Sequence, residues 1–185
     1  IVPVAAPCRS NTHLGGQFIV KTANAARGVE ITVVYASHAN NVPRSLLAEP
    51  LRKLYESDDT SHILGPPTGF IVRFTNGLTA YLSGDTGIHT EMRSVVNEYH
   101  KANLALFNLG TSAGTEASSA HAMNDLVRPA AVILSHPNEA VTEGGALRQA
   151  ARAATVVKML KMPAHLAISG RTMEFDGAGK CVAGC

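Results

Sequence analysis

Strand-like apolar segments alternate with helix-like segments along most of this chain. The strand-like segments are short runs rich in β-branched residues, whereas the helix-like segments carry apolar residues at intervals of three and four. Alternation of this kind is typical of an α/β domain, in which helices cover a sheet. The expected strands cover residues 28–35, 69–74, 78–83, 104–109, 130–135, 165–169 and 172–175, and the expected helices cover residues 43–57, 89–99, 115–127 and 144–160.

Glycine, proline and asparagine residues indicate where turns and breaks lie between or within these segments. Thr75-Asn76-Gly77 separates two alternating apolar runs, which predicts a tight β-hairpin. Pro50 lies inside a helix-like segment and predicts a kink or a split there. Residues 1–16 are rich in Pro, Ala and small polar side chains, so we expect them to form an irregular lead-in.

The composition narrows the class of protein and of partner. A chain of 185 residues can form one domain with a sizeable core. The formal net charge is only +2, the 16 basic residues are scattered, and aromatic residues make up 5% with no Trp, so nothing favours a nucleic-acid surface. No apolar run approaches the roughly 20 residues needed to cross a bilayer. We therefore expect a small-molecule substrate, with neither nucleic acid nor a membrane as a partner.

Polar clusters follow three of the expected strands. His38 lies after the first strand, Asp85 after the hairpin and His136 after residues 130–135. In α/β sheets the loops after the carboxyl ends of the strands converge on one crevice. Two imidazoles and one carboxylate form a ligand set that suits zinc or a similar divalent metal. The sequence therefore predicts a metal site formed by these three residues.

Each of the three residues also has an ordinary structural explanation. A single His at a strand end is more often a surface or hydrogen-bonded side chain than a metal ligand. An Asp that follows a Gly often caps the N–H groups of its own turn. The metal interpretation depends on the combination, because three strand ends carry these residue types in the order His, Asp, His.

Three segments in the right order resemble the metallo-β-lactamase-fold hydrolases, and among them the lactonase-like branch. These segments are Gly69-Phe70-Ile71-Val72, Asn76-Gly77 and Tyr81-Leu82-Ser83-Gly84-Asp85-Thr86-Gly87. The resemblance covers residues 28–169 and implies an α/β fold that forms the C-terminal half of a four-layer αββα sandwich. It also implies a two-metal site with His38, Asp85 and His136 as ligands, in which Asp85 bridges both metals.

The resemblance implies the chemistry of a metal-dependent hydrolase of a small ester, lactone or amide. Two divalent cations, zinc as the first choice and manganese or iron as alternatives, would share Asp85 and a bridging hydroxide that attacks the substrate. Asp85 would then be both a ligand and a catalytic residue. His121, on an expected helix, could contact the substrate or donate a proton, while Asn40 and His62 could bind the substrate.

One part of the family pattern is missing. The HxHxDH motif of the family would precede residue 1, and nothing within residues 1–185 replaces it. The chain also begins at Ile1 without a Met. We therefore expect residues 1–185 to be a single domain of a processed or split enzyme, completed by the N-terminal half of the same precursor as a second chain. Copies of that heterodimer could assemble further.

The sequence leaves more than one possibility open for the function of the protein and for its compartment. A non-catalytic binding subunit that kept the fold, or a phosphodiesterase, would share the same pattern of residues. Cys8, Cys181 and Cys185 lie near the two ends of the chain and favour a periplasmic or secreted protein with a disulfide. A cytoplasmic enzyme with three ordinary thiols is the alternative.

Overall fold

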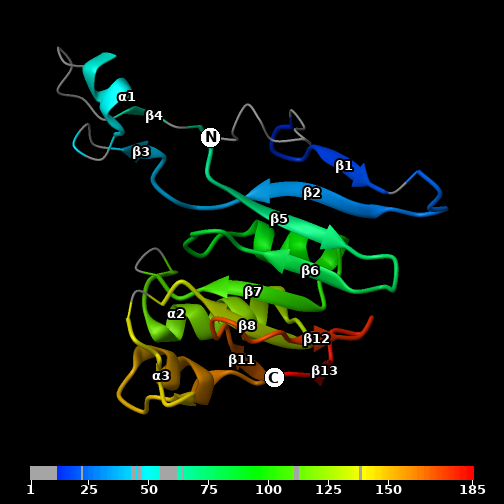
Figure 1. Cartoon of the computed structure of the whole chain (residues 1–185). Helices are drawn as coiled ribbons and strands as arrows, with labels where there is room; N and C mark the ends of the chain where they lie inside the picture. The colour runs from blue at the N-terminus through cyan, green and yellow to red at the C-terminus, as the bar shows by residue number, and fades with distance from the viewer. Residues whose placement is uncertain are drawn as a thin grey trace.

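A mixed seven-stranded sheet forms the centre of the molecule (Figure 1). The computed structural model describes residues 12–21, 23–42, 45, 47–54, 62–63, 65–110, 113–137 and 139–185. The order of strands across the sheet is β1-β2-β5-β6-β7-β8-β11. These strands are β1 (Gln17–Val20), β2 (Val29–Tyr35), β5 (Thr68–Arg73), β6 (Thr79–Leu82), β7 (Leu104–Asn108), β8 (Ala131–Ser135) and β11 (Ala164–Leu166).

The strand directions bring the carboxyl ends of five strands to one edge of the sheet. Strand β2 pairs antiparallel with β5, and β5 pairs antiparallel with β6, so β2 and β6 run in the same direction. Strand β7 pairs parallel with β6 and with β8, and β8 pairs parallel with β11. The chain therefore leaves β2, β6, β7, β8 and β11 at the same edge, which we call the site edge.

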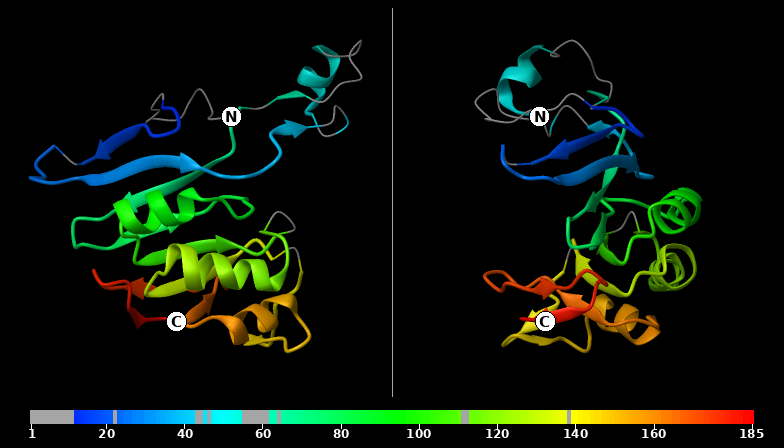
Figure 2. Two further views of the ribbon diagram at one scale, coloured as in Figure 1. Left: turned by 180° about the vertical axis from the view of Figure 1, so that it is seen from behind. Right: turned by 90° about the vertical axis from the view of Figure 1, so that its right-hand side faces the viewer.

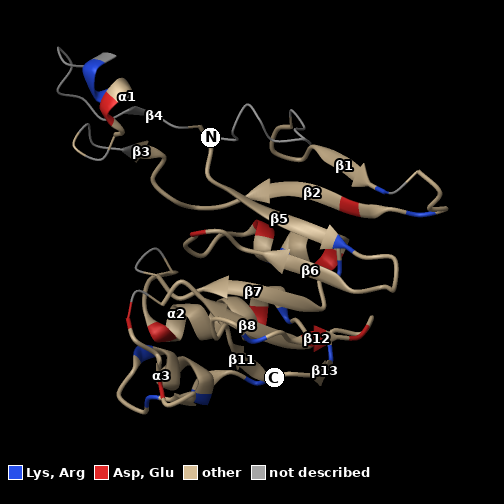
Figure 3. Ribbon diagram, viewed as in Figure 1, with Lys and Arg blue, Asp and Glu red and all other residues tan. Residues whose placement is uncertain are grey.

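Helices cover one face of this sheet (Figure 2). They are η2 (Met92–Tyr99), α2 (Glu116–His121), η4 (Ala122–Val127) and α3 (Arg152–Met159). The main core lies between the helices and the sheet, and its largest members include Val34, Ile71, Tyr81, Met92, Val96, Phe107, Leu109, Met123, Val132 and Leu134. Strands β6, β7 and β8 carry no Lys, Arg, Asp or Glu (Figure 3), as expected for strands whose side chains are mostly buried.

The opposite face of the sheet is covered over only part of its width. Strands β12 (Glu174–Phe175) and β13 (Cys181–Ala183) form a hairpin on this side, and Phe175 packs against a second core cluster. That cluster contains Leu78, Ala80, Leu104, Ala131 and Ile133. Further along the same face, Phe70, Val72, Leu82 and Leu106 are only half-buried. This part of the sheet is therefore apolar and partly open to solvent.

Smaller elements complete the described part of the chain. Strands β3 (Asn41–Val42) and β4 (His62–Ile63) pair with each other, and helix α1 (Glu49–Leu54) lies beside them, away from the sheet (Figure 1). Strands β9 (Thr142–Glu143) and β10 (Ala146–Leu147) form a second small hairpin. Within the described residues, no helix has the length and apolar character needed to cross a membrane.

The α/β class and the central hairpin were predicted correctly from the sequence. The turn between β5 and β6 contains Gly77 at φ 97°. The predicted helix over 144–160 was wrong in its first half, because Gly144 and Gly145 adopt positive φ in the β9–β10 turn and the helix begins only at Arg152. Within the described part of the predicted helix over 43–57, the α-helix begins only at Glu49, so Pro50 occupies its first turn, where its missing N–H costs nothing.

Six short strands were not predicted: β1, β3, β4, β9, β10 and β13. Strand β1 pairs antiparallel with β2, and its side chains are mostly exposed, so it lacks the apolar alternation that marks a buried strand. The irregular lead-in predicted for residues 1–16 is described only from residue 12, where it forms turns before β1.

Removal of one buried hydroxyl is expected to stabilise the fold. The Tyr81 ring is fully buried, and its hydroxyl has no hydrogen-bond partner within the described residues. Burial, with a smaller effect of the Glu91 carboxylate, raises the pKa of this hydroxyl. Because a buried hydroxyl without a partner costs about 1–3 kcal/mol, we expect Tyr81→Phe to raise the free energy of unfolding by about 1 kcal/mol in urea titrations.

The matched control is Tyr99→Phe, because the Tyr99 side chain is 75% exposed. We expect that variant to remain within about 0.5 kcal/mol of the parent. A loss of stability in Tyr81→Phe, with Tyr99→Phe neutral, would show that the Tyr81 hydroxyl makes a favourable hydrogen bond.

Candidate metal centre

Three side chains from three loops meet at the site edge. His38 follows β2, Asp85 follows β6 and His136 follows β8. Nε2 of His38 lies 3.2 Å from Oδ2 of Asp85, and Nε2 of His136 lies 3.5 Å from the same oxygen. The three side chains are 35%, 38% and 53% exposed for His38, Asp85 and His136, so a ligand can reach them from solvent. The strand-end pattern in the sequence thus placed these residues together correctly.

A buried amide holds the Asp85 carboxylate in position. Nδ2 of Asn108 donates a hydrogen bond to Oδ1 of Asp85 over 2.8 Å. Oδ1 of Asn108 accepts hydrogen bonds from the Thr86 backbone N–H and the Ser83 hydroxyl, both over 3.3 Å. Asn108 is only 2% exposed. Its contacts direct one carboxylate oxygen toward β7 and the other, Oδ2, toward the two imidazoles.

Asn108 was missed by the sequence reasoning, although the sequence carries a signal for it. It is the one polar residue in the apolar run Leu104–Leu109, at the carboxyl end of a buried strand. Burial of an amide is unfavourable unless its hydrogen bonds are satisfied, so a single Asn in such a run indicates a specific partner.

A second set of hydrogen bonds joins the His38 loop to the Asp85 loop. The backbone N–H of Ser37 donates to the Thr86 hydroxyl over 2.8 Å, and the N–H of Gly87 donates to the Ser37 carbonyl over 2.8 Å. Thr86 is fully buried. Because Ser37 and Thr86 are each adjacent to one of the converging residues, these bonds fix the distance between the two loops.

Glycine at position 110 allows close approach of the loop after β7. A Cβ atom on Gly110 would lie 2.8 Å from Cδ2 of His136 and 3.3 Å from Oδ1 of Asp85. The first distance is shorter than real Cβ contacts allow, so any larger residue would displace the His136 ring. His136 itself has φ 48°, which is uncommon for a residue other than Gly and is often associated with functional sites.

The hydrogen bonds of His38 test whether the site suits a cation. Its Nδ1 lies 2.6 Å from the Ala39 carbonyl oxygen, which makes Nδ1 the N–H donor. In a neutral imidazole, Nε2 then presents a lone pair toward Oδ2 of Asp85, which is also an acceptor. Two acceptors at 3.2 Å require a proton or a cation between them. This donor set therefore fits a bound metal.

The spacing of the donors leads to the same conclusion. Donors about 2.0–2.1 Å from a tetrahedral ion lie about 3.3 Å from one another. The separations of 3.2 and 3.5 Å around Oδ2 of Asp85 match this value. Within the described residues, no group of three or more His, Cys, Asp or Glu side chains encloses a single metal ion. The arrangement is instead two donor pairs that share one carboxylate oxygen.

Arg152 forms hydrogen bonds with residues between β7 and α2. Arg152 on α3 donates hydrogen bonds to Oε1 of Glu116 over 2.9 Å, to the Leu109 carbonyl over 3.0 Å and to the Gly114 carbonyl. A backbone hydrogen bond at Glu116, followed by the charge of Arg152, lowers the pKa of the Glu116 carboxyl. Arg152 thus ties the segment after Asn108 to a helix of the core.

The other residues singled out from the sequence lie apart from this group or outside what is described. Nδ1 of His121 lies 2.8 Å from Oδ2 of Asp125, and this hydrogen bond lowers the pKa of Asp125. His121 also lines a groove on the helical face with Ile88. Asn40 is exposed in the loop after His38. The backbone of His62 belongs to β4, but its side chain is outside the described residues. Roles for these residues stay predictions.

Comparison with curated proteins gives relatives that are named metal-dependent hydrolases. A "UPF0173 metal-dependent hydrolase" from Polynucleobacter asymbioticus is 32% identical over 155 residues, which cover 80% of this chain and 48% of that protein. A protein of the same name from Polaromonas sp. is 32% identical over 116 residues, covering 62% of this chain and 40% of that protein. This chain is a homologue of those hydrolases. It spans about half the length of the curated relatives it matches. No family model matches it.

A solved structure shares the fold. Igni18, described as a novel metallo hydrolase from the hyperthermophilic archaeon Ignicoccus hospitalis, matches 94% of this chain and 59% of its own chain. The TM-score is 0.51 and the sequence identity is 21%. This similarity supports the α/β arrangement of the sheet and helices. The four-layer sandwich, of which this chain would form half, stays a prediction.

Loss of the Asn108 amide is expected to weaken metal binding. In Asn108→Ala, Asp85 loses the donor that orients its carboxylate, and loss of such a support usually lowers metal affinity about 10–100-fold. Isothermal titration of the chain with Zn²⁺ measures the change. Asn97→Ala is the matched control, because Asn97 donates a hydrogen bond of 2.9 Å to the Leu126 carbonyl on the helical face. Equal Zn²⁺ affinities in the two folded variants would contradict the role assigned to Asn108.

Proposed function

We propose that this chain is one part of a metal-dependent hydrolase of the metallo-β-lactamase type that cleaves a small ester, lactone or amide. The observation that carries the proposal is the convergence of two imidazole Nε2 atoms on a single carboxylate oxygen at the site edge. The homology to proteins named metal-dependent hydrolases supports it independently.

His38, Asp85 and His136 would hold two divalent cations, with Asp85 between them. Zinc is the first choice because the donors are nitrogen and carboxylate oxygen, with manganese or iron as alternatives. Bound cations of this kind polarise the substrate and lower the pKa of water toward neutrality. Asn108 would keep Oδ2 of Asp85 directed at the cations, and Gly110 would leave room for the His136 ring.

We assign contacts with the substrate to residues around His38, Asp85 and His136. Asn40 follows the His38 loop and is exposed, so its amide can bind a polar substrate group. We assign His62 to substrate binding and His121 to substrate contact or proton donation, as the sequence suggested. Asp125 would hold the His121 ring through its 2.8 Å hydrogen bond.

The partner in this proposal is the N-terminal half of the same precursor, as a second chain. The arrangement of the donors supports it, because the described donors form only two pairs. The half-buried apolar side chains Phe70, Val72, Leu82 and Leu106 offer a surface that this partner would cover. Such heterodimers could pair into larger oligomers.

An oxidising compartment, the periplasm or the cell exterior, fits the C-terminal strand. Cys181 and Cys185 form a disulfide with Cα atoms 6.4 Å apart. Disulfides persist mainly in exported proteins, whereas cytoplasmic thiols stay reduced. A cytoplasmic location would require this bond to be open in the cell.

Hydrolysis assays on native protein, purified without denaturant, test the function. The substrates are p-nitrophenyl acetate, a chromogenic thiolactone, a p-nitroanilide and bis(p-nitrophenyl) phosphate. We expect cleavage of one of the first three, loss of activity with EDTA and recovery with Zn²⁺. Asp85→Asn is expected to lower kcat/KM by about 10³-fold or more, since the shared carboxylate would be lost.

Asp176→Asn is the control, because the Asp176 carboxylate accepts hydrogen bonds from the Ala178 and Lys180 backbone N–H groups in the turn between β12 and β13, and an Asn side chain can accept them too. Cleavage of the phosphodiester alone would make the protein a phosphodiesterase. Metal-free native protein without activity on any substrate would make it a binding subunit and would refute the proposal.

A further inference from the structure

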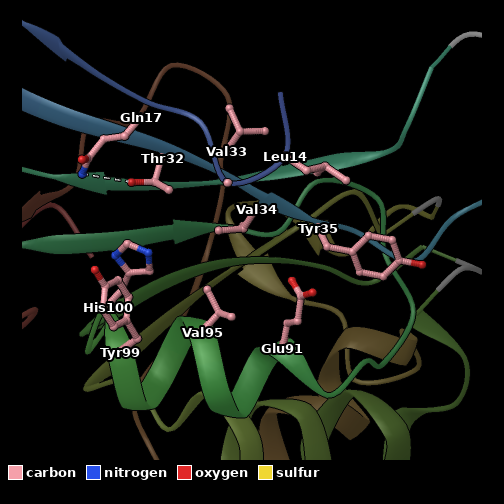
Figure 4. Close-up of a pocket in the computed structure, with 11 residues that line it drawn as sticks. Leu14, Gln17, Thr32, Val33, Val34, Tyr35, Glu91, Val95, Tyr99 and His100 are labelled. Carbon is pink, nitrogen blue, oxygen red and sulfur yellow. Dashed lines mark hydrogen bonds between the residues drawn. The ribbon is translucent and has the colours of Figure 1, made fainter. Parts of the chain in front are cut away.

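A cavity of about 520 Å³ lies between strand β2 and helix η2, apart from the metal centre (Figure 4). Its walls come from the turn before β1, from β1 and β2, and from the start and end of η2. None of His38, Asp85 and His136 contributes to it. The lining residues are Leu14, Gly15, Gln17, Thr32, Val33, Val34, Tyr35, Glu91, Val95, Tyr99 and His100.

The cavity combines an apolar body with aromatic ends. Val34 and Val95 form apolar walls from the sheet and from the helix. Figure 4 shows the Tyr35 ring toward one end, and Tyr99 with His100 toward the other. The rings of Tyr99 and His100 pack edge to face with centroids 4.8 Å apart. Aromatic faces attract cations through their electron-rich π-systems.

Glu91 gives this cavity a negative charge. It is the only Asp, Glu, Lys or Arg among the lining residues, and Figure 4 shows its carboxylate rising from the helix toward Tyr35. Within the described part of the chain, no hydrogen bond or ion pair joins this carboxylate to another residue. Its charge also acts on the buried Tyr81 hydroxyl and on His89.

Nearby positive charge does not neutralise Glu91. Burial, followed by the charge of Arg73, lowers the pKa of His100, so its ring is neutral at pH 7. Arg73 itself is paired with Glu30, with 3.6 Å between Nη1 and Oε2. Gln17 and Thr32 share a hydrogen bond of 3.4 Å between their side chains. The Glu91 carboxylate is therefore available to attract a cation from solution into a cavity with apolar walls and aromatic side chains at both ends.

We propose that this cavity binds an organic ammonium ion that carries an apolar or aromatic group. The ammonium group would pair with Glu91, and the apolar group would lie against Val34 and Val95 between the aromatic ends. A bare metal cation fits poorly, because hard cations such as Ca²⁺ need six to eight oxygen ligands and only one carboxylate is present. Anions are excluded by the sign of the charge. The proposal does not depend on the metal centre or on hydrolysis.

Three probes of similar shape and different charge test the proposal on the full chain. They are 2-phenylethylammonium, the neutral 2-phenylethanol and the anionic 3-phenylpropanoate. NMR spectra of methyl-labelled protein follow Val33, Val34 and Val95, which line the cavity. We expect the ammonium probe to shift these methyl signals in a saturable way, with at least tenfold higher affinity than the neutral probe, and the anion to give no shift.

Substitutions of Glu91 distinguish the effect of its charge on binding from the effect of the cavity's shape. Glu91→Gln is expected to lower the affinity for 2-phenylethylammonium at least tenfold, and Glu91→Lys to shift the preference to 3-phenylpropanoate. Glu98→Gln is the matched control, since Glu98 lies on the same helix but is exposed and does not line the cavity. Equal binding of the ammonium and neutral probes, no binding of the ammonium probe, or equal affinities in Glu91→Gln and Glu98→Gln would overturn the proposal.

Discussion

The shared direction of β2, β6, β7 and β8 is the constraint on which the metal centre depends. Two antiparallel pairings, β2 with β5 and β5 with β6, return the chain to the direction of the parallel strands. An odd number of reversals would have sent His38 to the far edge of the sheet, away from Asp85 and His136. Register matters as well, because a shift of one residue turns every side chain to the other face. The pairing of Asn108 with Ser135 fixes that register beside the site.

The polar residues beneath the site edge are stable there because they satisfy one another. Ser83, Thr86 and Asn108 are each at most 2% exposed, and burial of such groups is unfavourable without hydrogen bonds. The Thr86 hydroxyl accepts from the Ser37 N–H, while the Asn108 amide bonds to Asp85 and Thr86. The same bonds that make burial tolerable also direct Oδ2 of Asp85 toward His38 and His136. Stability and the geometry of the candidate site therefore have a common origin.

Much of the fold was predictable because apolar periodicity reports burial directly. Strands β2, β5, β6, β7 and β8 carry the strongest apolar patterns, and all five were predicted near their observed bounds. Strand β1 and the β9–β10 hairpin were not predicted from the sequence. An exposed edge strand and a pair of two-residue strands bury few apolar side chains, so their sequences show no alternating apolar pattern. Strand-end positions predicted the grouping of His38, Asp85 and His136. Neither Asn108 nor the Glu91 cavity was foreseen, since each arises from contacts between elements distant in sequence.

Anomalous diffraction from crystals of the native, metal-replete protein tests the assignment of His38, Asp85 and His136 as metal ligands. Data on both sides of the zinc absorption edge locate the metal without reference to activity. This ligand assignment predicts anomalous peaks within about 2.0–2.2 Å of Asp85 Oδ2 and of Nε2 of His38 and His136. It also predicts that the remaining ligands of each ion come from a second chain. Peaks elsewhere in the molecule, or a metal-replete protein in which these three residues contact no metal, would contradict it.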